Sequence, residues 1–226
     1  MKKALCLQHV SFEGPGVFQP YLEKRGITLQ RTLVPSEGIP GDIPDLLLVM
    51  GGPMSVNDAD PWIGEELAFI GQTIEAEVPV LGVCLGSQFI AKALGGQVNP
   101  GPRLEIGPVP IALTVEEDTD PVFGMFPPTL EVFQWHGEGL TLPPGAILLG
   151  SSEHYPVQAF RFGKRTYGLL FHLELEPEGV EALCRECAKD VQLAGTTAED
   201  LLKSASQVLP QSHELAERLI AHLTTC

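Results

Sequence analysis

The sequence predicts an α/β protein with three layers, in which a mostly parallel central sheet has helices on both faces and an antiparallel portion. Two observations support this fold class. In the first hundred residues or so, short apolar runs alternate with helix-like segments, an order typical of a parallel sheet with crossover helices. Between residues 109 and 176, strand-like runs follow one another across Pro and Gly turns, which favours antiparallel pairing.

Four runs in the first part of the chain are expected to form buried strands. Each is short, continuous and apolar, and each is closed by Gly, Pro or polar residues. These runs are KALCLQHV (3–10), ITLQRTLV (27–34), LLLVMGG (46–52) and VPVLGVC (78–84).

Three segments between and after these strands predict helices, at residues 17–26, 60–77 and 85–96. The second has Asp60 as its N-cap and Pro61 at its first helical position, where proline loses no intrahelical bond. The third ends on a pair of glycines, which suits a helix C-cap.

The second half of the chain begins with closely spaced strand-like runs and ends in helices. The runs are 109–115, 130–136, 146–152, 155–163 and 166–174. Helices are expected at 177–191, 196–209 and 212–223, with Thr196 and Glu199 forming a capping box. We expect one domain over residues 1–190, with residues 191–226 as a helical extension packed on it.

Composition restricts the classes of partner. The 226 residues carry a formal net charge of −15, which should repel nucleic acids and anionic membranes. The five cysteines are scattered without a disulfide-like spacing, as expected in a reducing compartment. Gln8 and His9 interrupt the first apolar run too early for a signal peptide, and no later run approaches a membrane span. We therefore expect a cytoplasmic protein without nucleic-acid or membrane partners.

The segment Gly82-Val83-Cys84-Leu85-Gly86 places a cysteine between a predicted strand and a predicted helix. It matches G-x-C-x-G, the cysteine form of the nucleophile elbow, in which a tight turn strains the nucleophile and the glycines prevent clashes. The helix N-terminus favours a thiolate, and its free N–H groups, notably that of Leu85, can face an oxyanion. The alternative is a buried structural cysteine, so the nucleophile interpretation requires a base elsewhere.

A candidate base lies near the end of the last predicted strand, in the segment His172-Leu173-Glu174. On a strand, residues i and i+2 point to the same face, so Glu174 can orient and stabilise the His172 imidazole. The alternative is a surface histidine beside a solvated glutamate. His9 and His136 also stand at predicted strand ends and compete for the role.

Three motifs together resemble the class I, triad-type glutamine amidotransferases. They are LLLVMGGPMSV, PVLGVCLGSQFIAKALGG and GLLFHLE, which occur in the family's order over most of the chain. They are most similar to the amidotransferase domain of GMP synthase and its free-standing relatives. The resemblance implies a flavodoxin-like, class I amidotransferase fold and hydrolysis of glutamine.

The resemblance also implies catalytic roles. Cys84 would attack the γ-carboxamide of glutamine, and His172 would pass the thiol proton to the leaving ammonia. Glu174 would hold His172. Gly52 would supply a second oxyanion-hole N–H beside that of Leu85.

The same resemblance implies four residues that bind the substrate. Gln88 lies one helical turn after Cys84 and would help to hold glutamine. Gln134, Trp135 and His136 would line its amino-acid end. The alternatives are an exposed helix position for Gln88 and a core position for Trp135.

One residue departs from the family pattern. The family commonly has proline between the histidine and the glutamate of the triad, whereas this chain has Leu173. Proline stiffens the bend but contributes nothing to the chemistry, so we expect activity to survive. The change suggests a free-standing subgroup rather than a synthase domain.

An acceptor site for ammonia is not evident in the sequence. The chain contains no G-x-x-x-x-G-K-[ST] loop for ATP. Either a separate synthase subunit supplies the acceptor site, or the protein is a stand-alone hydrolase of glutamine or another γ-glutamyl compound. We expect no cofactor. We also expect no metal, because the pair Cys184 and Cys187 has no two further ligands nearby.

Two other classes stay open. A cysteine α/β-hydrolase acting on esters or lactones would order its triad nucleophile, acid, histidine, but here the acid follows the histidine. A non-catalytic amidotransferase-like module would be favoured by loss of the cysteine or histidine, and both are present.

Overall fold

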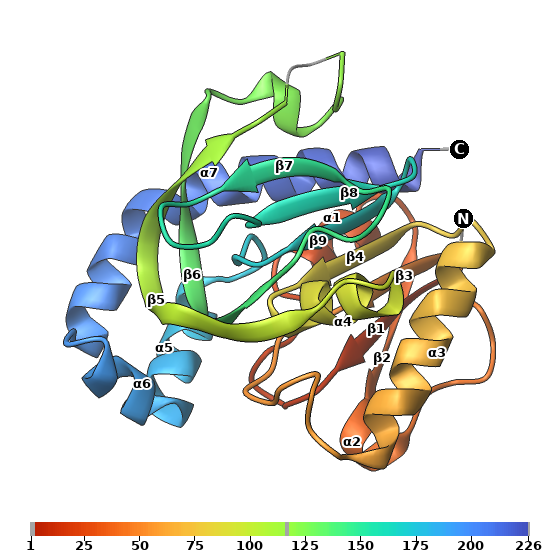
Figure 1. The fold of residues 1–226 in the computed structure, drawn as a ribbon, viewed down its shortest axis with the longest axis horizontal. Helices are drawn as coiled ribbons and strands as arrows, with labels where there is room; N and C mark the ends of the chain where they lie inside the picture. The colour runs from red at the N-terminus through yellow and green to blue at the C-terminus, as the bar shows by residue number, and fades with distance from the viewer. Residues whose placement is uncertain (1–2, 116–117, 226) are drawn as a thin grey trace.

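The computed structural model describes residues 3–115 and 118–225. Within these ranges the strands form one nine-stranded sheet with the order β2-β1-β3-β4-β9-β8-β7-β5-β6. Helices cover both faces of this sheet (Figure 1). The predicted three-layer α/β fold with parallel and antiparallel portions is therefore confirmed.

The parallel portion contains the first four strands together with the last one. Its members are β1 (Lys3–Gln8), β2 (Thr28–Leu33), β3 (Leu46–Val49), β4 (Val80–Val83) and β9 (Thr166–Leu169). In β3, Leu46 and Leu48 enter the core on one side of the sheet, and Leu47 and Val49 enter the core on the other. This alternation explains why a strand buried on both faces is apolar throughout.

The antiparallel portion continues from β9, which pairs parallel with β4 and antiparallel with β8. The run at 166–174, expected among the antiparallel runs, thus has one neighbour of each kind. The antiparallel portion consists of β8 (Ala159–Phe162), β7 (Ile147–Ser151), β5 (Val98–Leu113) and β6 (Thr129–Leu140). β5 begins eleven residues before the predicted strand at 109–115, since Val98 is its first residue. Its register against β6 shifts between Pro100 and Glu105, so the long β5–β6 pair is irregular there.

Helices pack in two main layers. On one face lie α1 (Phe18–Glu23) and the second half of α7 (Ala198–Thr224), with the 3-10 turn η1 (Phe123–Met125). On the other face lie α2 (Val34–Glu37), α3 (Pro61–Glu75) and α4 (Leu85–Ala93). The short helix α2 was not predicted.

The ends of α3 and α4 lie where the sequence placed them. Asp60 is the N-cap residue of α3 and Pro61 its first helical residue, but the Asp60 side chain makes no capping hydrogen bond. α4 is followed by Gly95, with φ of +87°, and the Gly96 N–H donates to the Ala91 carbonyl at 2.8 Å. This glycine-terminated end confirms the predicted C-cap.

The tail differs from the prediction in two ways. The helix expected at 177–191 is divided at Cys187 into α5 (Pro177–Glu186) and α6 (Ala188–Leu193). The helices expected at 196–209 and 212–223 are the single helix α7, which continues through Pro210. Proline removes one backbone donor, but the apolar face of α7 packs on both sides of it, which holds the helix together.

The predicted capping box was also wrong by one position. The N-cap of α7 is Thr197, whose Oγ1 accepts a hydrogen bond from the Asp200 N–H at 3.1 Å. Thr197 in turn donates to the Asp200 carboxylate at 2.7 Å. Thr197 therefore caps the helix, but the Asp200 carboxylate binds the Thr197 hydroxyl in place of its backbone N–H, so the pair is not a complete capping box.

α7 contacts two different parts of the molecule. Its first half packs with α5, α6 and β6 through Leu201, Val208 and Leu209. Its second half joins the core under the sheet through residues such as Leu215 and Leu219. The division into a domain at 1–190 and an extension at 191–226 stays a prediction.

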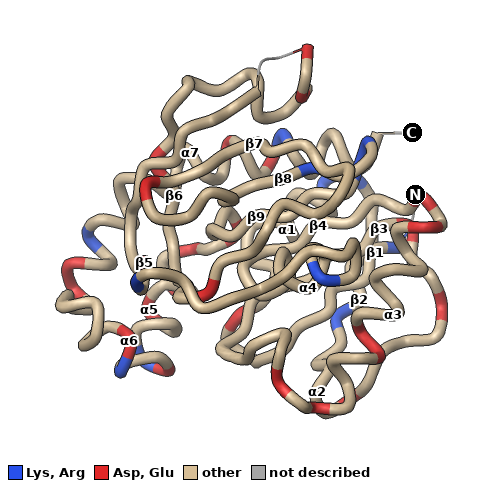
Figure 2. Tube along the Cα trace, in the orientation of Figure 1, with Lys and Arg blue, Asp and Glu red and all other residues tan. Residues whose placement is uncertain are grey.

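Charged residues are distributed over helices and loops around the whole fold, with acidic residues more numerous than basic ones (Figure 2). Among the described residues, no helix combines the length and the apolar character that crossing a bilayer requires, even though α7 has 27 residues.

Candidate active site

Cys84 stands at the corner between β4 and α4, with φ of +52° and ψ of −111°. A positive φ is strained for a residue with a side chain, so the surrounding packing must enforce it. A Cβ on Gly82 would lie 2.5 Å from the backbone of Gly86, and a Cβ on Gly86 would lie 2.0 Å from the Val49 carbonyl oxygen. Both glycines are therefore required by the close approach of strand and helix at this corner.

Two backbone N–H groups beside Cys84 are free. Leu85 is the first residue of α4, and Gly52 lies in the loop after β3; both line the same pocket as Cys84. Neither N–H donates a hydrogen bond to any residue within 3–115 or 118–225. Free N–H groups at a helix start are suited to bind an anionic oxygen.

His172 and Glu174 form a buried pair. The Glu174 Oε1 accepts from His172 Nδ1 at 2.7 Å, and the two residues are 1% and 2% exposed. The expected reason for their proximity is wrong, however, because β9 already ends at Leu169. The pair meets across a bend after the strand, where the Leu173 N–H donates to Glu174 Oε2 at 3.0 Å.

Contacts from three other elements hold this bend. The His172 N–H donates to the Phe133 carbonyl in β6 at 2.9 Å. The Glu174 carbonyl accepts from the Val17 N–H, next to α1, at 3.0 Å. His213 of α7 contacts the Leu175 carbonyl at 2.8 Å. The geometry of the His172–Glu174 pair is therefore set by the fold rather than by a single strand.

Opposing effects act on the pKa of His172. Burial alone would lower this pKa, but the Glu174 carboxylate and the Cys84 side chain raise it well above its ordinary value. The Nε2 atom of His172 is buried and has no hydrogen-bond partner among the described residues. With Nδ1–H donated to Glu174, Nε2 is the atom that is free to take a proton.

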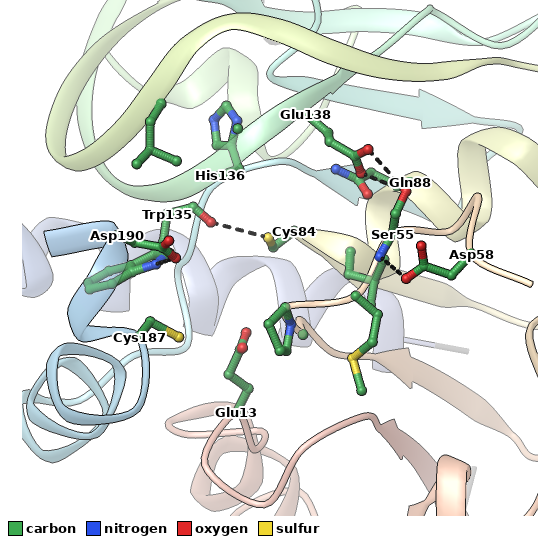
Figure 3. Close-up of a pocket in the computed structure, with 16 residues that line it drawn as sticks. Glu13, Ser55, Asp58, Cys84, Gln88, Trp135, His136, Glu138, Cys187 and Asp190 are labelled. Carbon is green, nitrogen blue, oxygen red and sulfur yellow. Dashed lines mark hydrogen bonds between the residues drawn. The ribbon is translucent and has the colours of Figure 1, made fainter. Parts of the chain in front are cut away.

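Cys84 lies near the centre of a pocket of about 370 Å³ (Figure 3). Its Sγ contacts the Trp135 carbonyl oxygen at 3.5 Å, and its side chain is 7% exposed. The residues that line the pocket are Glu13, Gly52, Pro53, Met54, Ser55, Asp58, Cys84, Leu85, Gln88, Leu104, Trp135, His136, Gly137, Glu138, Cys187 and Asp190.

Six of the nine residues singled out in the sequence line this pocket. Cys84, Gly52, Leu85, Gln88, Trp135 and His136 form one group, while His172 and Glu174 are buried and do not line it. Gln134 does not line it either. It is fully buried, and its Nε2 donates to the Gln158 Oε1 at 2.9 Å.

The chemical state of the pocket residues follows from their surroundings. Gln88 is 3% exposed, so it is not the exposed helix residue of the alternative interpretation. His136 has both ring nitrogens buried without hydrogen-bond partners among the described residues. Burial, reinforced by repulsion from His172, lowers its pKa to about 3, so the ring is neutral.

Sequence reasoning missed several polar residues of the pocket. Ser55 donates from Oγ to Glu138 at 3.0 Å and from its N–H to Asp58 at 2.9 Å. Asp190 accepts from Trp135 Nε1 at 3.3 Å. Only Glu13 carried a usable signal, because it follows the first strand at the carboxyl edge where open sheets bind ligands.

Glu13 lies close to the catalytic candidates. Figure 3 shows its carboxylate pointing toward the space in front of Cys84. Burial, opposed by attraction to His172 and reinforced by repulsion from Glu174, raises its pKa to about 7. Glu13 therefore changes charge near neutral pH.

Similar proteins place this geometry in context. The chain is 33% identical to the glutamine amidotransferase-like protein YfeJ of Salmonella typhimurium over 96% of its length and 95% of the relative's. It is 37% identical to one subunit of the glutamine-hydrolysing GMP synthase of Thermococcus kodakarensis, over 62% of this chain and 72% of that one. The match to the GMP synthase of Neisseria meningitidis covers 26% of that longer protein.

Solved structures agree in fold over almost the whole chain. A glutamine amidotransferase from Methylobacillus flagellatus superposes with a TM-score of 0.91 and 31% identity, covering 99% of this chain and 94% of that one. One from Thermotoga maritima has a TM-score of 0.90 and 27% identity, covering 99% of both chains. The family model for class I glutamine amidotransferases matches residues 20–187. The chain belongs to the class I glutamine amidotransferase family.

Proposed function

We propose that the protein hydrolyses the γ-carboxamide of glutamine with Cys84 as nucleophile, His172 as base and Glu174 as the group that orients His172. The main support is the buried pair of His172 and Glu174. The Nε2 atom of His172 has no hydrogen-bond partner among the described residues, and Cys84 raises the pKa of the same ring. A histidine between a carboxylate and a nucleophile is the arrangement that activates a thiol.

Acylation begins when His172 Nε2 takes the proton of Cys84. Glu174 raises the pKa of the imidazole, which favours the thiolate–imidazolium pair over the two neutral groups. The thiolate attacks the carboxamide carbon, and the C–N bond then breaks as the imidazolium gives its proton to the leaving ammonia. The product is a γ-glutamyl thioester on Cys84.

The oxygen of the carboxamide becomes negative in this step. The free N–H groups of Gly52 and Leu85 would donate to it, and they line the pocket beside Cys84. Donors that are already oriented stabilise a developing charge without reorganisation, and one such donor is worth about 10²- to 10³-fold in kcat.

Hydrolysis of the thioester completes the cycle. With ammonia gone, His172 again has a free Nε2 and removes a proton from an attacking water. Collapse of the second tetrahedral intermediate releases glutamate and restores the thiol. The same residue thus acts as base in one half of the reaction and as acid in the other.

The pocket around Cys84 would hold the substrate's amino-acid end. Gln88, Trp135 and His136 line it, together with carboxylates such as Glu138 and Asp58, which suit the α-ammonium group of glutamine. Gln134 supports this wall from behind through its hydrogen bond to Gln158. We therefore assign it an indirect role in place of substrate contact.

Ammonia released here would pass to a separate acceptor subunit. The relative from Thermococcus kodakarensis is one subunit of a glutamine-hydrolysing synthase, which supports this arrangement. A stand-alone γ-glutamyl hydrolase and a non-catalytic binding module are the alternatives. A glutaminase assay of the isolated protein, repeated with cell extract, separates these cases, because only a partner-dependent enzyme is stimulated by the extract.

Cys84→Ala provides the direct test. The variant should fold normally and release no ammonia from glutamine or another γ-glutamyl amide, because the thioester cannot form. A diazo-ketone analogue of glutamine should label Cys84 in the wild-type protein. Unchanged turnover of the variant, or a label on Cys6 or Cys187 instead, would reject the assignment.

A further inference from the structure

A second buried histidine–glutamate pair lies behind the loop that carries Gly52. His9 follows β1, and its Nε2 lies 3.0 Å and 3.1 Å from the two carboxylate oxygens of Glu66 in α3. The Nδ1 of the same ring lies 3.0 Å from the carbonyl oxygen of Gly51. Both side chains of the pair are completely buried. The reaction proposed above uses neither residue.

The partners of His9 determine its protonation. A carbonyl oxygen only accepts hydrogen bonds, and so does an ionised carboxylate. With both partners accepting, both ring nitrogens of His9 carry a proton, which makes the ring a cation. Burial alone would lower the pKa of His9, but the Glu66 carboxylate outweighs burial and raises it, in agreement with the contacts.

The carbonyl that His9 holds belongs to the peptide whose N–H is the candidate oxyanion donor. In a trans peptide the C=O of Gly51 and the N–H of Gly52 point in opposite directions. Fixing the carbonyl toward His9 therefore fixes the Gly52 N–H on the side away from His9. A positive charge at the carbonyl oxygen also polarises the amide, which makes its N–H a stronger donor.

Packing leaves this peptide little freedom. A Cβ on Gly52 would lie 3.0 Å from the His9 Cβ and 3.1 Å from a methyl group of Leu85. The His9 ring stacks on Phe89 with centroids 5.4 Å apart and planes 3° from parallel. Phe89 lies one turn after Leu85 in α4, so the helix that supplies one free N–H also supports the ring that holds the other.

We propose that His9 and Glu66 are positioning residues for the oxyanion hole, with His9 orienting and polarising the Gly51–Gly52 peptide and Glu66 holding His9. This inference rests on the proposed function. It predicts that the pair stabilises the tetrahedral intermediate and contributes little to glutamine binding. Loss of the pair should thus reduce kcat rather than raise KM.

Two substitutions of His9 distinguish the effect of its hydrogen bond to Gly51 from the effect of losing the ring itself. In His9→Asn the amide nitrogen can occupy roughly the place of Nδ1, so the donor to Gly51 is kept. In His9→Gln the amide reaches roughly the place of Nε2, so that donor is lost. We expect His9→Gln to lower kcat by about 10²-fold and His9→Asn by less than about tenfold.

Glu66→Gln removes the charge at nearly constant shape and should lower kcat by about tenfold. Thr73→Val is the matched control. Thr73 is fully buried two turns along the same helix, and among the described residues its hydroxyl donates only to the Phe69 carbonyl of its own helix. This variant should keep the wild-type kcat, although it loses a buried hydrogen bond.

Two further measurements distinguish positioning from general damage. A γ-aldehyde analogue of glutamine adds the Cys84 thiol and forms an oxyanion, so its affinity should fall by about the same factor as kcat. Iodoacetamide alkylates the thiol by displacement at carbon, without an oxyanion, so its rate should be unchanged. Thermal unfolding of each variant reports on its stability, and Glu66→Gln carries the test if His9→Gln does not fold.

The outcomes are distinct. Full kcat in His9→Gln or, if that variant does not fold, in Glu66→Gln overturns the inference. So does an equal loss in His9→Asn and His9→Gln, or an equal slowing of alkylation. In all of these cases the wild-type enzyme still hydrolyses glutamine, and the proposed function stands. A wild-type protein that neither releases ammonia nor binds the aldehyde overturns both.

Discussion

Two buried histidine–glutamate pairs that are joined by hydrogen bonds stand at the carboxyl edge of the sheet, one after β9 and one after β1. His172 and Glu174 are two residues apart, whereas His9 and Glu66 are separated by 57 positions and come from different elements. In each pair the carboxylate raises the pKa of the ring against the effect of burial. What differs is the neighbour of the other ring nitrogen.

The neighbour of this second nitrogen determines whether the histidine of each pair can exchange a proton. The second nitrogen of His172 has no hydrogen-bond partner among the described residues, so it is open for the proton exchange with Cys84 that we propose. The second nitrogen of His9 is used by the Gly51 carbonyl, so that proton stays in place. In our proposal, a carboxylate-supported imidazole is therefore a base in one position and a fixed cation in the other.

His172→Ala should have the largest effect. Without a base the thiol is not activated, and we expect kcat for glutamine to fall by about 10⁵-fold. Steady-state ammonia release is the measurement, with His9→Gln as the companion. If His172→Ala lost no more activity than His9→Gln, the distinction between the two pairs would disappear.

Glu174→Gln and Glu66→Gln make the same chemical change in the two pairs. We expect the first to lower kcat by about 10³- to 10⁴-fold, because the tautomer and charge of the base are lost. The second should cost only about tenfold, because it acts through the peptide. Comparable losses in the two variants, measured in parallel, would show that the pairs are not functionally different.

The charges of both pairs affect the pKa of Glu13, and its titration should change the free energy of unfolding with pH. The ordinary pKa of a glutamate is 4.5, and that of Glu13 in the folded protein is about 7. Burial is the main cause of this rise, and repulsion from Glu174 adds to it. Between these values the folded protein holds a proton that the unfolded chain releases. The free energy of unfolding therefore falls as pH rises through this window, by roughly 3 kcal/mol in total.

Glu13→Gln should remove this loss. The difference in unfolding free energy, variant minus wild type, should be larger at pH 8 than at pH 4.5. Urea unfolding of both proteins at the two pH values measures it. An identical pH dependence of the two proteins would mean that Glu13 ionises normally and does not respond to the neighbouring pairs.

Leu173→Pro should have the smallest effect. Proline would remove the N–H that Leu173 donates to Glu174 Oε2 at 3.0 Å, leaving the bond from His172 intact. We expect kcat to fall by less than about tenfold. Leu173→Ala keeps the N–H and is the control; a larger loss in the alanine variant would assign the effect to packing of the buried leucine.

The parallel half of the fold was predictable from local sequence. The strands β1, β3 and β4 are continuous apolar runs, and the segment around Cys84 has glycines where strand and helix touch, so these strands and the turn could be assigned without tertiary information. β2 was expected to be buried, but it is the edge strand of the sheet, and Thr28, Gln30 and Arg31 are exposed. The resemblance to class I amidotransferases, confirmed by the family match over residues 20–187, depended on the same segments.

Features that depend on distant contacts were not predictable. The bend at His172 is held by Phe133, Val17 and His213. Strand alternation therefore predicted correctly that His172 and Glu174 are neighbours, but the two residues do not lie on a strand. The continuity of α7 through Pro210 depends on packing against two separate surfaces. The His9–Glu66 contact requires knowledge of which helix covers β1, which no local pattern contains.

The break between α5 and α6 has a consequence for how this protein can diverge from its relatives. Cys187 and Asp190 extend into the pocket from that break, and the family match ends at Cys187. One wall of the pocket thus belongs to a segment, at the start of α6, that contains none of the proposed catalytic residues. Selection for a differently shaped amide can act on this wall alone and leave the chemistry at the elbow untouched.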